Sequence, residues 1–139
     1  NNLMNKKVLI VSANYYKDIS KDLISDTQLL LKRFKIKNDL VIVPGVFEIP
    51  VILSKNIKKY DGFIALGCVI KGQTPHFDFI SKTTFEGLML LSIKHKKPIG
   101  NGIITSLNKE QAEQRSSTNS DQGKGKEAAK AVISILSLK

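Results

Sequence analysis

Four continuous apolar runs, rich in β-branched residues and separated by segments of helical periodicity, constrain the fold of this chain most. The runs cover residues 8–13, 40–43, 63–70 and 99–105. Each reads as a continuous apolar run and not as an alternating one. Such a strand is covered on both faces, as the strands of parallel sheets are. The pattern therefore predicts a four-stranded parallel sheet with helices on both sides.

The connections between these runs carry the signals of crossover helices. In the first connection the apolar residues fall on one helical stripe, and Asp18 or Ser20 is available as the N-cap. The second helix is expected to start around Val46, with Pro50 in its first turn, where proline is tolerated.

A third helix is expected from Thr74 and Pro75 to Lys94, because a capping residue followed by proline is typical of a helix start. The last helix is expected to begin near Lys124. The predicted order is βαβαβαβα, a doubly wound α/β fold in which the sheet is the middle layer of an α/β/α sandwich.

The length of 139 residues suits a single domain, 1–139, and the polar segment 116–123 is expected to be a loop within it. A disulfide scaffold and a structural zinc site are excluded, because the chain has one cysteine and two histidines. We expect no bound metal. No targeting signal or membrane-length apolar run is visible, so we expect a cytoplasmic protein with no membrane partner.

The formal net charge of +10 raises the question of a nucleic-acid partner. Of the 22 basic residues only Arg33 and Arg115 are arginines, and the lysines are scattered rather than clustered. Base and phosphate readers favour the bidentate guanidinium group, and no nucleic-acid-binding motif accompanies the charge. We therefore expect no nucleic-acid partner, and interpret the lysines as a solvated surface that attracts anionic substrates.

In open α/β sheets ligands bind beyond the carboxyl ends of the strands, so the residues after each run are the candidate site. These are segments 14–16, 44–48 and 71–76, and the segment that leads to Arg115. No glycine-rich dinucleotide or P-loop spacing is present. We therefore expect no nucleotide cofactor.

The third of these segments can bind an anion and move a proton. Gly72, Gln73 and Thr74 precede a predicted helix whose backbone N–H groups suit a phosphate or carboxylate, although an ordinary N-cap has the same pattern. His76 follows in the first turn, where the helix dipole disfavours the protonated imidazole and leaves a base. A structural histidine bonded to the backbone is the alternative.

The other segments supply aromatic and charged side chains. Tyr15, Tyr16 and Phe47 could stack on a flat heterocycle or fill gaps in the core. Glu48 could bind hydroxyl groups or offset the dipole of its own helix. Arg115 could clamp a phosphate, assisted by Lys124, or form a surface ion pair. Cys68 lies within an apolar run, and the sequence shows no base paired with it. We therefore do not expect a nucleophilic cysteine.

Blocks 43–50, 65–78 and 111–115, followed by Lys124 and Gly125, resemble the lumazine synthase family over nearly the whole chain. The resemblance implies a four-stranded parallel flavodoxin-like sheet. It also implies condensation of 5-amino-6-(D-ribitylamino)uracil with 3,4-dihydroxy-2-butanone 4-phosphate to 6,7-dimethyl-8-ribityllumazine, the penultimate step of riboflavin synthesis. No metal or organic cofactor is implied. A non-catalytic flavodoxin-like binding protein and a basic nucleic-acid-binding protein are the alternatives, and neither explains the long blocks.

The resemblance also implies the roles of the site residues. The substrates would be held by Tyr15, Val46, Phe47, Glu48, Cys68, Val69, Ile70, Gly72, Gln73, Thr74, Asn101, Arg115 and Lys124. His76 would be the catalytic residue and would shuttle protons. The family's site lies between subunits of a pentamer, so Asn101, Arg115 and Lys124 would come from a neighbouring copy. We therefore expect a homopentamer or a multiple of pentamers. Asn101 replaces an aromatic residue that is frequent in the family.

Overall fold

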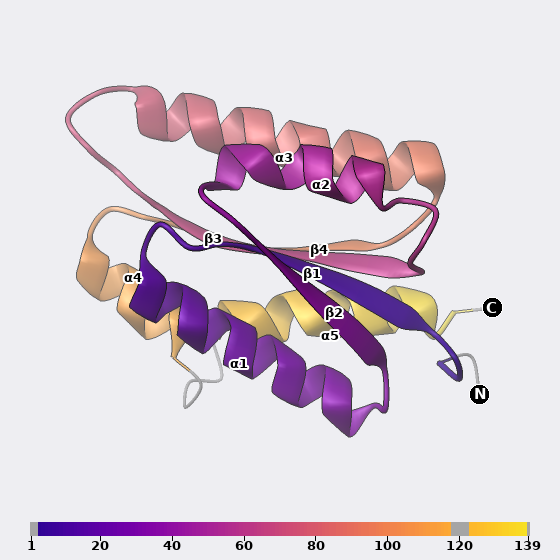
Figure 1. Cartoon of the computed structure of the whole chain (residues 1–139). Helices are drawn as coiled ribbons and strands as arrows, with labels where there is room; N and C mark the ends of the chain where they lie inside the picture. The colour runs from indigo at the N-terminus through magenta and orange to yellow at the C-terminus, as the bar shows by residue number, and fades with distance from the viewer. Residues whose placement is uncertain (1–2, 118–122, 139) are drawn as a thin grey trace.

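A computed structural model describes residues 3–117 and 123–138 of the chain. Its sheet consists of β1 (Lys7–Ala13), β2 (Lys37–Val43), β3 (Gly62–Ile70) and β4 (Ile99–Ser106). All neighbouring pairs are parallel, and the strand order is β2-β1-β3-β4 (Figure 1). The four apolar runs are therefore confirmed as the strands of a flavodoxin-like parallel sheet.

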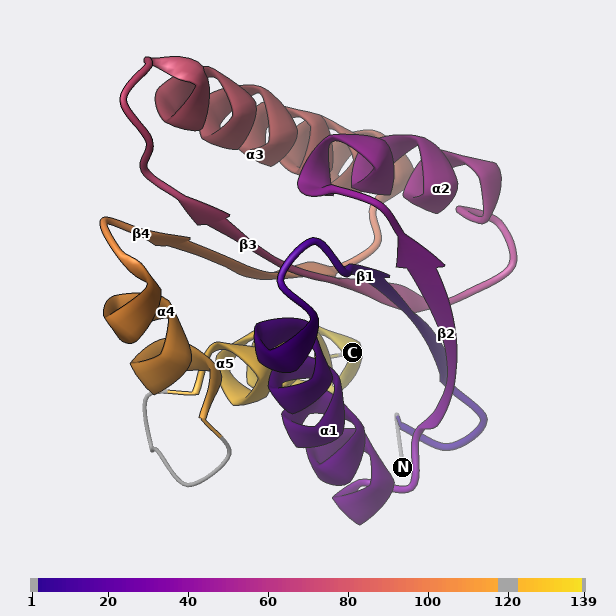
Figure 2. The ribbon, with the colours of Figure 1, turned by 60° about the vertical axis from the view of Figure 1, so that its left-hand side comes forward.

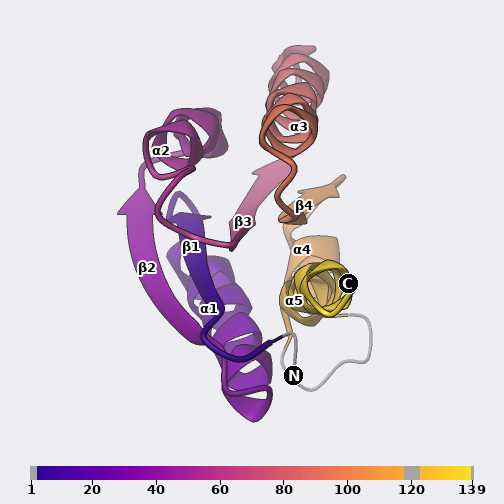
Figure 3. The same ribbon diagram turned by 90° about the vertical axis from the view of Figure 1, so that its right-hand side faces the viewer.

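Helices cover both faces of the sheet. Helices α2 (Ile49–Lys55) and α3 (His76–His95) lie on one face, and α1 (Lys17–Arg33), α4 (Lys109–Ser116) and α5 (Lys124–Leu136) lie on the other. Figures 1 and 2 show the two groups of helices on opposite sides of the strands, and Figure 3 shows the same layers from the side. The predicted three-layer α/β/α sandwich is confirmed.

Successive residues of the central strands supply two separate cores. In β1, Val8 and Ile10 pack in the core under α1 and α5, whereas Leu9 and Val11 pack in the core under α2 and α3. Side chains alternate between the faces of a strand, so a strand buried on both faces is apolar at most positions in succession. This is the physical reason why the runs of the central strands do not alternate. The expectation of cover on both faces is wrong for β2, which lies at the edge of the sheet and leaves Leu40 38% and Ile42 47% exposed.

The start of α1 differs from the prediction. The helix begins at Lys17, and its N-cap position belongs to Tyr16, so neither Asp18 nor Ser20 is the cap. Ser20 is buried in the first turns, and its hydroxyl donates a hydrogen bond of 2.8 Å to the carbonyl oxygen of Ala13. The serine therefore fixes the turn between β1 and α1 instead of capping the helix.

The other predicted helices are confirmed with small shifts. A 3-10 turn, η1 (Val46–Glu48), precedes α2, and Pro50 lies in the first turn of α2 as expected. Helix α3 begins at His76, one residue later than the cap-and-proline pattern indicates. Helix α5 begins at Lys124 as predicted.

Helix α4 was not predicted from the sequence. Apart from Ala112 and Ser116 its residues are not buried, so it has no apolar stripe that would indicate a helix. Its start is defined by polar groups: Asn108 Oδ1 accepts the Gln111 N–H at 2.9 Å, and Gln111 Oε1 accepts the Leu107 N–H at 2.9 Å. The predicted loop 116–123 is wrong at Ser116, which ends α4, and its central part, 118–122, lies outside the described residues.

Within the part of the chain that is described, no helix combines the length and the apolar character needed to cross a membrane.

Candidate active site

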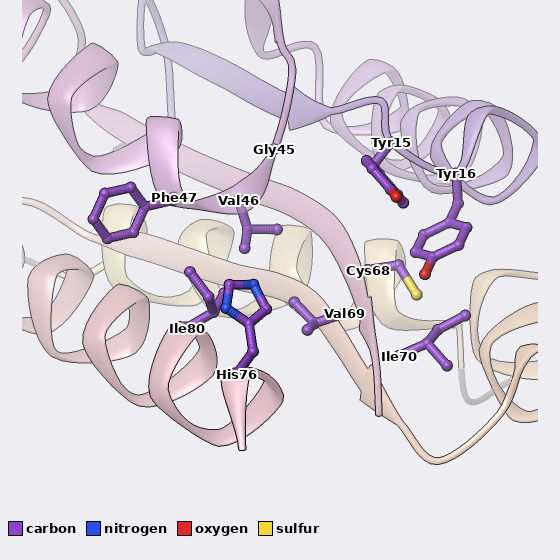
Figure 4. Close-up of a pocket in the computed structure, with 10 residues that line it drawn as sticks. All are labelled: Tyr15, Tyr16, Gly45, Val46, Phe47, Cys68, Val69, Ile70, His76 and Ile80. Carbon is purple, nitrogen blue, oxygen red and sulfur yellow. The ribbon is translucent and has the colours of Figure 1, made fainter. Parts of the chain in front are cut away.

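A pocket of about 430 Å³ opens at the carboxyl ends of β1, β2 and β3 (Figure 4). Its volume lies in the range of small-molecule sites. The end of each of these strands and the first turn of α3 contribute side chains. The lining consists of Tyr15, Tyr16, Gly45, Val46, Phe47, Cys68, Val69, Ile70, His76 and Ile80.

The wall after β1 is formed by two tyrosines. Tyr15 and Tyr16 pack edge to face, with ring centroids 5.0 Å apart and planes at 76°. The turn that carries them is held by the N–H of Asn14, which donates to the Val43 carbonyl oxygen at 3.0 Å. Tyr15 is 75% exposed, so a face of its ring is open to a ligand. Tyr16 is half-buried, with its hydroxyl directed toward the sulfur of Cys68 in Figure 4.

The wall after β2 is formed by η1. Val46 is buried and packs against the backbone of Gly67, while Phe47 is 58% exposed at the pocket mouth. Glu48 does not line the pocket, but its carboxylate lies against Gly45, which does. The carboxylate is therefore at the edge of the pocket rather than inside it.

The floor is formed by the last three residues of β3. Cys68 and Ile70 lie on the side of Tyr16, and Val69 lies on the side of His76 (Figure 4). Burial raises the pKa of the Cys68 thiol to about 11. Burial, followed by the nearby Cys68 and Tyr15, raises the pKa of the Tyr16 hydroxyl. Both groups are therefore neutral at physiological pH and can act as hydrogen-bonding groups toward a ligand.

The fourth wall is the start of α3. His76 is exposed at the first position of the helix, and Figure 4 shows its imidazole directed into the pocket beside Val46 and Val69. The predicted anion-binding residues precede it in an exposed segment that does not line the pocket. Thr74 Oγ1 accepts the His76 N–H at 3.4 Å, and a Cβ on Gly72 would meet no described atom within 4 Å. Space for a ligand is therefore open around Gly72.

Besides Glu48 and residues 72–74, three more predicted site residues lie outside the lining that the described residues form. Asn101 pairs with Ala65, five residues before the end of β3, and its Oδ1 accepts the Ile103 N–H at 3.0 Å. Arg115 is exposed on α4, and its Nη1 donates to the Thr105 carbonyl oxygen at 3.1 Å. Lys124 pairs with Glu127 at 3.3 Å at the start of α5.

Three lining residues are absent from the set of substrate contacts that the family resemblance implies. Tyr16 follows Tyr15 directly, and Gly45 precedes Val46, so both stand in segments that the sequence singles out. Ile80 stands one helical turn after His76, and this spacing places both on one face of α3. The spacing of four residues from His76 could therefore have indicated that Ile80 lines the pocket.

Among the described residues, no three histidine, cysteine, aspartate or glutamate side chains come together as a metal site would require.

Comparisons with known proteins show the family of the chain. The family model of 6,7-dimethyl-8-ribityllumazine synthase matches residues 5–139. The chain is 40% identical to the 6,7-dimethyl-8-ribityllumazine synthase of Bartonella tribocorum, with 98% of this chain and 93% of the relative covered. It is 39% identical to the enzymes of that name from Afipia carboxidovorans (96% and 85% covered) and Agrobacterium fabrum (95% and 93% covered). The chain therefore belongs to the 6,7-dimethyl-8-ribityllumazine synthase family.

Proposed function

We infer that this chain catalyses the condensation of 5-amino-6-(D-ribitylamino)uracil with 3,4-dihydroxy-2-butanone 4-phosphate, which forms 6,7-dimethyl-8-ribityllumazine and releases phosphate and water. Membership of the family supports the reaction. The observation that carries the inference is the pocket itself, in which an exposed histidine faces aromatic and apolar walls at the carboxyl edge of the sheet. We propose that residues 1–139 form one domain that works in the cytoplasm.

The pyrimidine ring is assigned to the part of the pocket between β1 and β3. The open face of Tyr15 would stack on the ring, because flat heterocycles and aromatic side chains prefer offset stacking. Val69 and Ile70 would contact the uracil edge, and the neutral Cys68 thiol would lie beneath it. A neutral floor suits this substrate, since the uracil ring is uncharged.

The ribityl chain is assigned to the segment after β2. Val46 and Phe47 line this side of the pocket and would contact the carbon chain, while the carboxylate of Glu48 at the pocket edge would accept hydrogen bonds from the hydroxyl groups. One charged acceptor beside an apolar surface matches the mixed character of a sugar alcohol.

The phosphate of the second substrate is assigned to Gly72, Gln73 and Thr74, before the start of α3. The first backbone N–H groups of a helix have no partner within the helix and favour an anion. Arg115 would add a bidentate guanidinium contact, and Lys124 a point charge. Both cations lie outside the lining of their own chain, so we assign them, with Asn101, to the pocket of a neighbouring copy.

His76 is assigned the proton transfers. In imine formation the substrate amine adds to the ketone carbonyl, the nitrogen gives up both of its protons in turn, and the carbonyl oxygen takes up two protons and leaves as water. An imidazole at the pocket wall can accept the first proton and return it to the leaving oxygen, and it can repeat this exchange during phosphate elimination and ring closure. Holding the two substrates side by side would supply much of the acceleration.

We propose that the working form is a homopentamer or a multiple of pentamers. The number five is implied by the family resemblance. Contact between copies is supported by large apolar side chains left exposed on α3: Phe79, Met89, Leu90 and Ile93. Phe79, Leu90 and Ile93 are separated by about three turns and one turn, so they share one face of the helix. An apolar face of this size is covered in most proteins by another protein surface. Light scattering should give about five times 15.4 kDa or a multiple of that mass.

The direct test is to incubate the purified protein with both substrates and to follow the fluorescence of the lumazine product. We expect product only when both substrates are present. Binding of the pyrimidine without turnover would instead indicate a non-catalytic binding protein with the same pocket. Omitting either substrate is the control for background fluorescence.

A further inference from the structure

The start of α5 is held by a residue from another helix. The N-cap residue of α5 is Gly123, which has no side chain to accept the unpaired N–H groups of the first turn. The N–H of Lys126 instead donates to Oδ2 of Asp26 at 3.2 Å, across 100 positions of the sequence. Asp26 therefore caps α5 from the middle of α1.

Burying this carboxylate is unfavourable by itself. Asp26 is 0% exposed, and among the described residues its Oδ1 has no hydrogen-bond partner, although it lies 3.5 Å from Lys126 Nζ. Burial raises the pKa of Asp26, and Lys126 opposes this shift only in part. A buried charge that is not fully satisfied usually costs stability. The presence of a buried carboxylate at position 26 is therefore not explained by a gain in stability.

Beneath the cap, the first turn of α5 lies in close contact with α1. A Cβ on Gly125 would lie 2.7 Å from the carbonyl oxygen of Leu23 and 2.8 Å from Oγ1 of Thr27. The backbone of the first turn of α5 therefore rests directly on α1. A shift of this turn along α1 would break the hydrogen bond to Asp26 and would move Lys124, the first residue of α5.

We propose that Asp26 is a positioning residue, which fixes the first turn of α5 on α1 and so sets where Lys124 presents its charge to the phosphorylated substrate. The proposal rests on the proposed function for the role of Lys124. Asp26 does not touch the substrate, since it is buried between the two helices on the face of the sheet opposite α3. Its effect should therefore appear in the binding of one substrate and not in the chemistry.

Three variants separate positioning from a general structural role. Asp26→Ala removes the acceptor and should raise KM for the phosphorylated substrate about five-fold or more, with KM for the pyrimidine within two-fold of wild type. Asp26→Asn keeps an oxygen acceptor and should restore the wild-type KM. Asp22→Ala removes a charge from the exposed face of the same helix and should change neither KM.

Amide hydrogen exchange provides a readout that does not depend on activity. Exchange at Gly125, Lys126 and Glu127 should accelerate in Asp26→Ala and stay at the wild-type rate in Asp26→Asn. An unchanged KM for the phosphorylated substrate in Asp26→Ala, or equal changes for both substrates, would overturn the positioning role. If wild type forms no lumazine, the proposed function and the role of Lys124 are both wrong, and the exchange pattern alone then decides whether Asp26 fixes this turn.

Discussion

Val46 lies directly on Gly67, so the wall of the pocket after β2 rests on a position that has room for a hydrogen atom only. A Cβ built on Gly67 would lie 2.6 Å from Cγ1 of Val46 and 3.3 Å from Cβ of Ala13. The glycine stands in the middle of β3, where its φ is not positive, so its role is steric rather than conformational. The size of this residue thus sets how deep η1 sits over the sheet.

Gly67→Ala should destabilise the fold and displace the pocket wall. The β-branched Val46 has little rotamer freedom with which to avoid the added methyl group, so an overpacking cost of about 1–3 kcal/mol is expected. Urea unfolding followed by circular dichroism measures this change. KM for the pyrimidine should rise as well, because Val46 and Phe47 would move together.

Gly72→Ala is the matched control, because a methyl group there meets no described atom within 4 Å. Its urea midpoint should equal that of wild type. An equal loss of stability in the two variants would contradict the steric argument at Gly67.

His76→Ala should lower kcat by about 10²-fold if the imidazole transfers protons. The side chain is exposed, so the free energy of unfolding should change by no more than about 0.5 kcal/mol. His95→Ala removes the other histidine, at the far end of α3, and should leave kcat unchanged. A His76 variant with the wild-type kcat would remove the residue from its proposed role.

Cys68 should react slowly with iodoacetamide in the folded protein. Its pKa of about 11 lies above the ordinary value of 9.0 because burial disfavours the thiolate. At pH 8 only about one thiol in 10³ is ionised, and the rate of alkylation should rise about ten-fold per pH unit until the pH approaches 11. Mass spectrometry of the alkylated protein follows the reaction.

Cys68→Ser should retain most of the activity, since a neutral thiol with no paired base is not a nucleophile. Rapid alkylation at neutral pH, with a midpoint near that of an ordinary thiol, would show that Cys68 is not held in the buried environment described here.

The sheet and the helices with apolar faces could be predicted because burial imposes periodicity. Val8 to Val11 serve two cores in alternation, and this appears in the sequence as an uninterrupted apolar run. Helix α4 carries no such pattern, because Ala112 is its only buried apolar residue. Its one local signal is the pair Asn108 and Gln111, which cap the start of the helix with polar groups.

The site residues that directly follow the strand ends could be predicted from the sequence. Contacts that depend on helix packing or on strand register could not. Tyr15, Phe47 and His76 each stand at a junction that the carboxyl edge of a parallel sheet brings together. The contact between Asp26 and Lys126 depends on how two helices pack side by side, and no spacing within either helix reports it. The distance of Asn101 from the pocket of its own chain likewise depends on strand register.

Arg115→Ala should raise KM for the phosphorylated substrate by at least about ten-fold and leave KM for the pyrimidine unchanged, because a clamp on the phosphate does not contact the other substrate. Arg33→Ala removes the only other arginine, in the last turn of α1, and is the control for lost positive charge. Steady-state kinetics with each substrate varied in turn gives both constants. A change confined to the pyrimidine would show that Arg115 is misassigned.

Mixing two impaired variants tests whether neighbouring copies share a pocket. If His76 and Arg115 reach one pocket from different subunits, His76→Ala and Arg115→Ala chains folded together in equal amounts should create intact pockets. Each pocket receives its histidine from one copy and its arginine from the next, so random assembly leaves about one quarter of the pockets with both residues. Activity at low concentrations of the phosphorylated substrate should therefore recover to about one quarter of wild type, against about one tenth or less for Arg115→Ala alone and about one hundredth for His76→Ala alone. If both residues serve the pocket of their own chain, no mixture contains an intact pocket, and its activity will be the mean of the two variants.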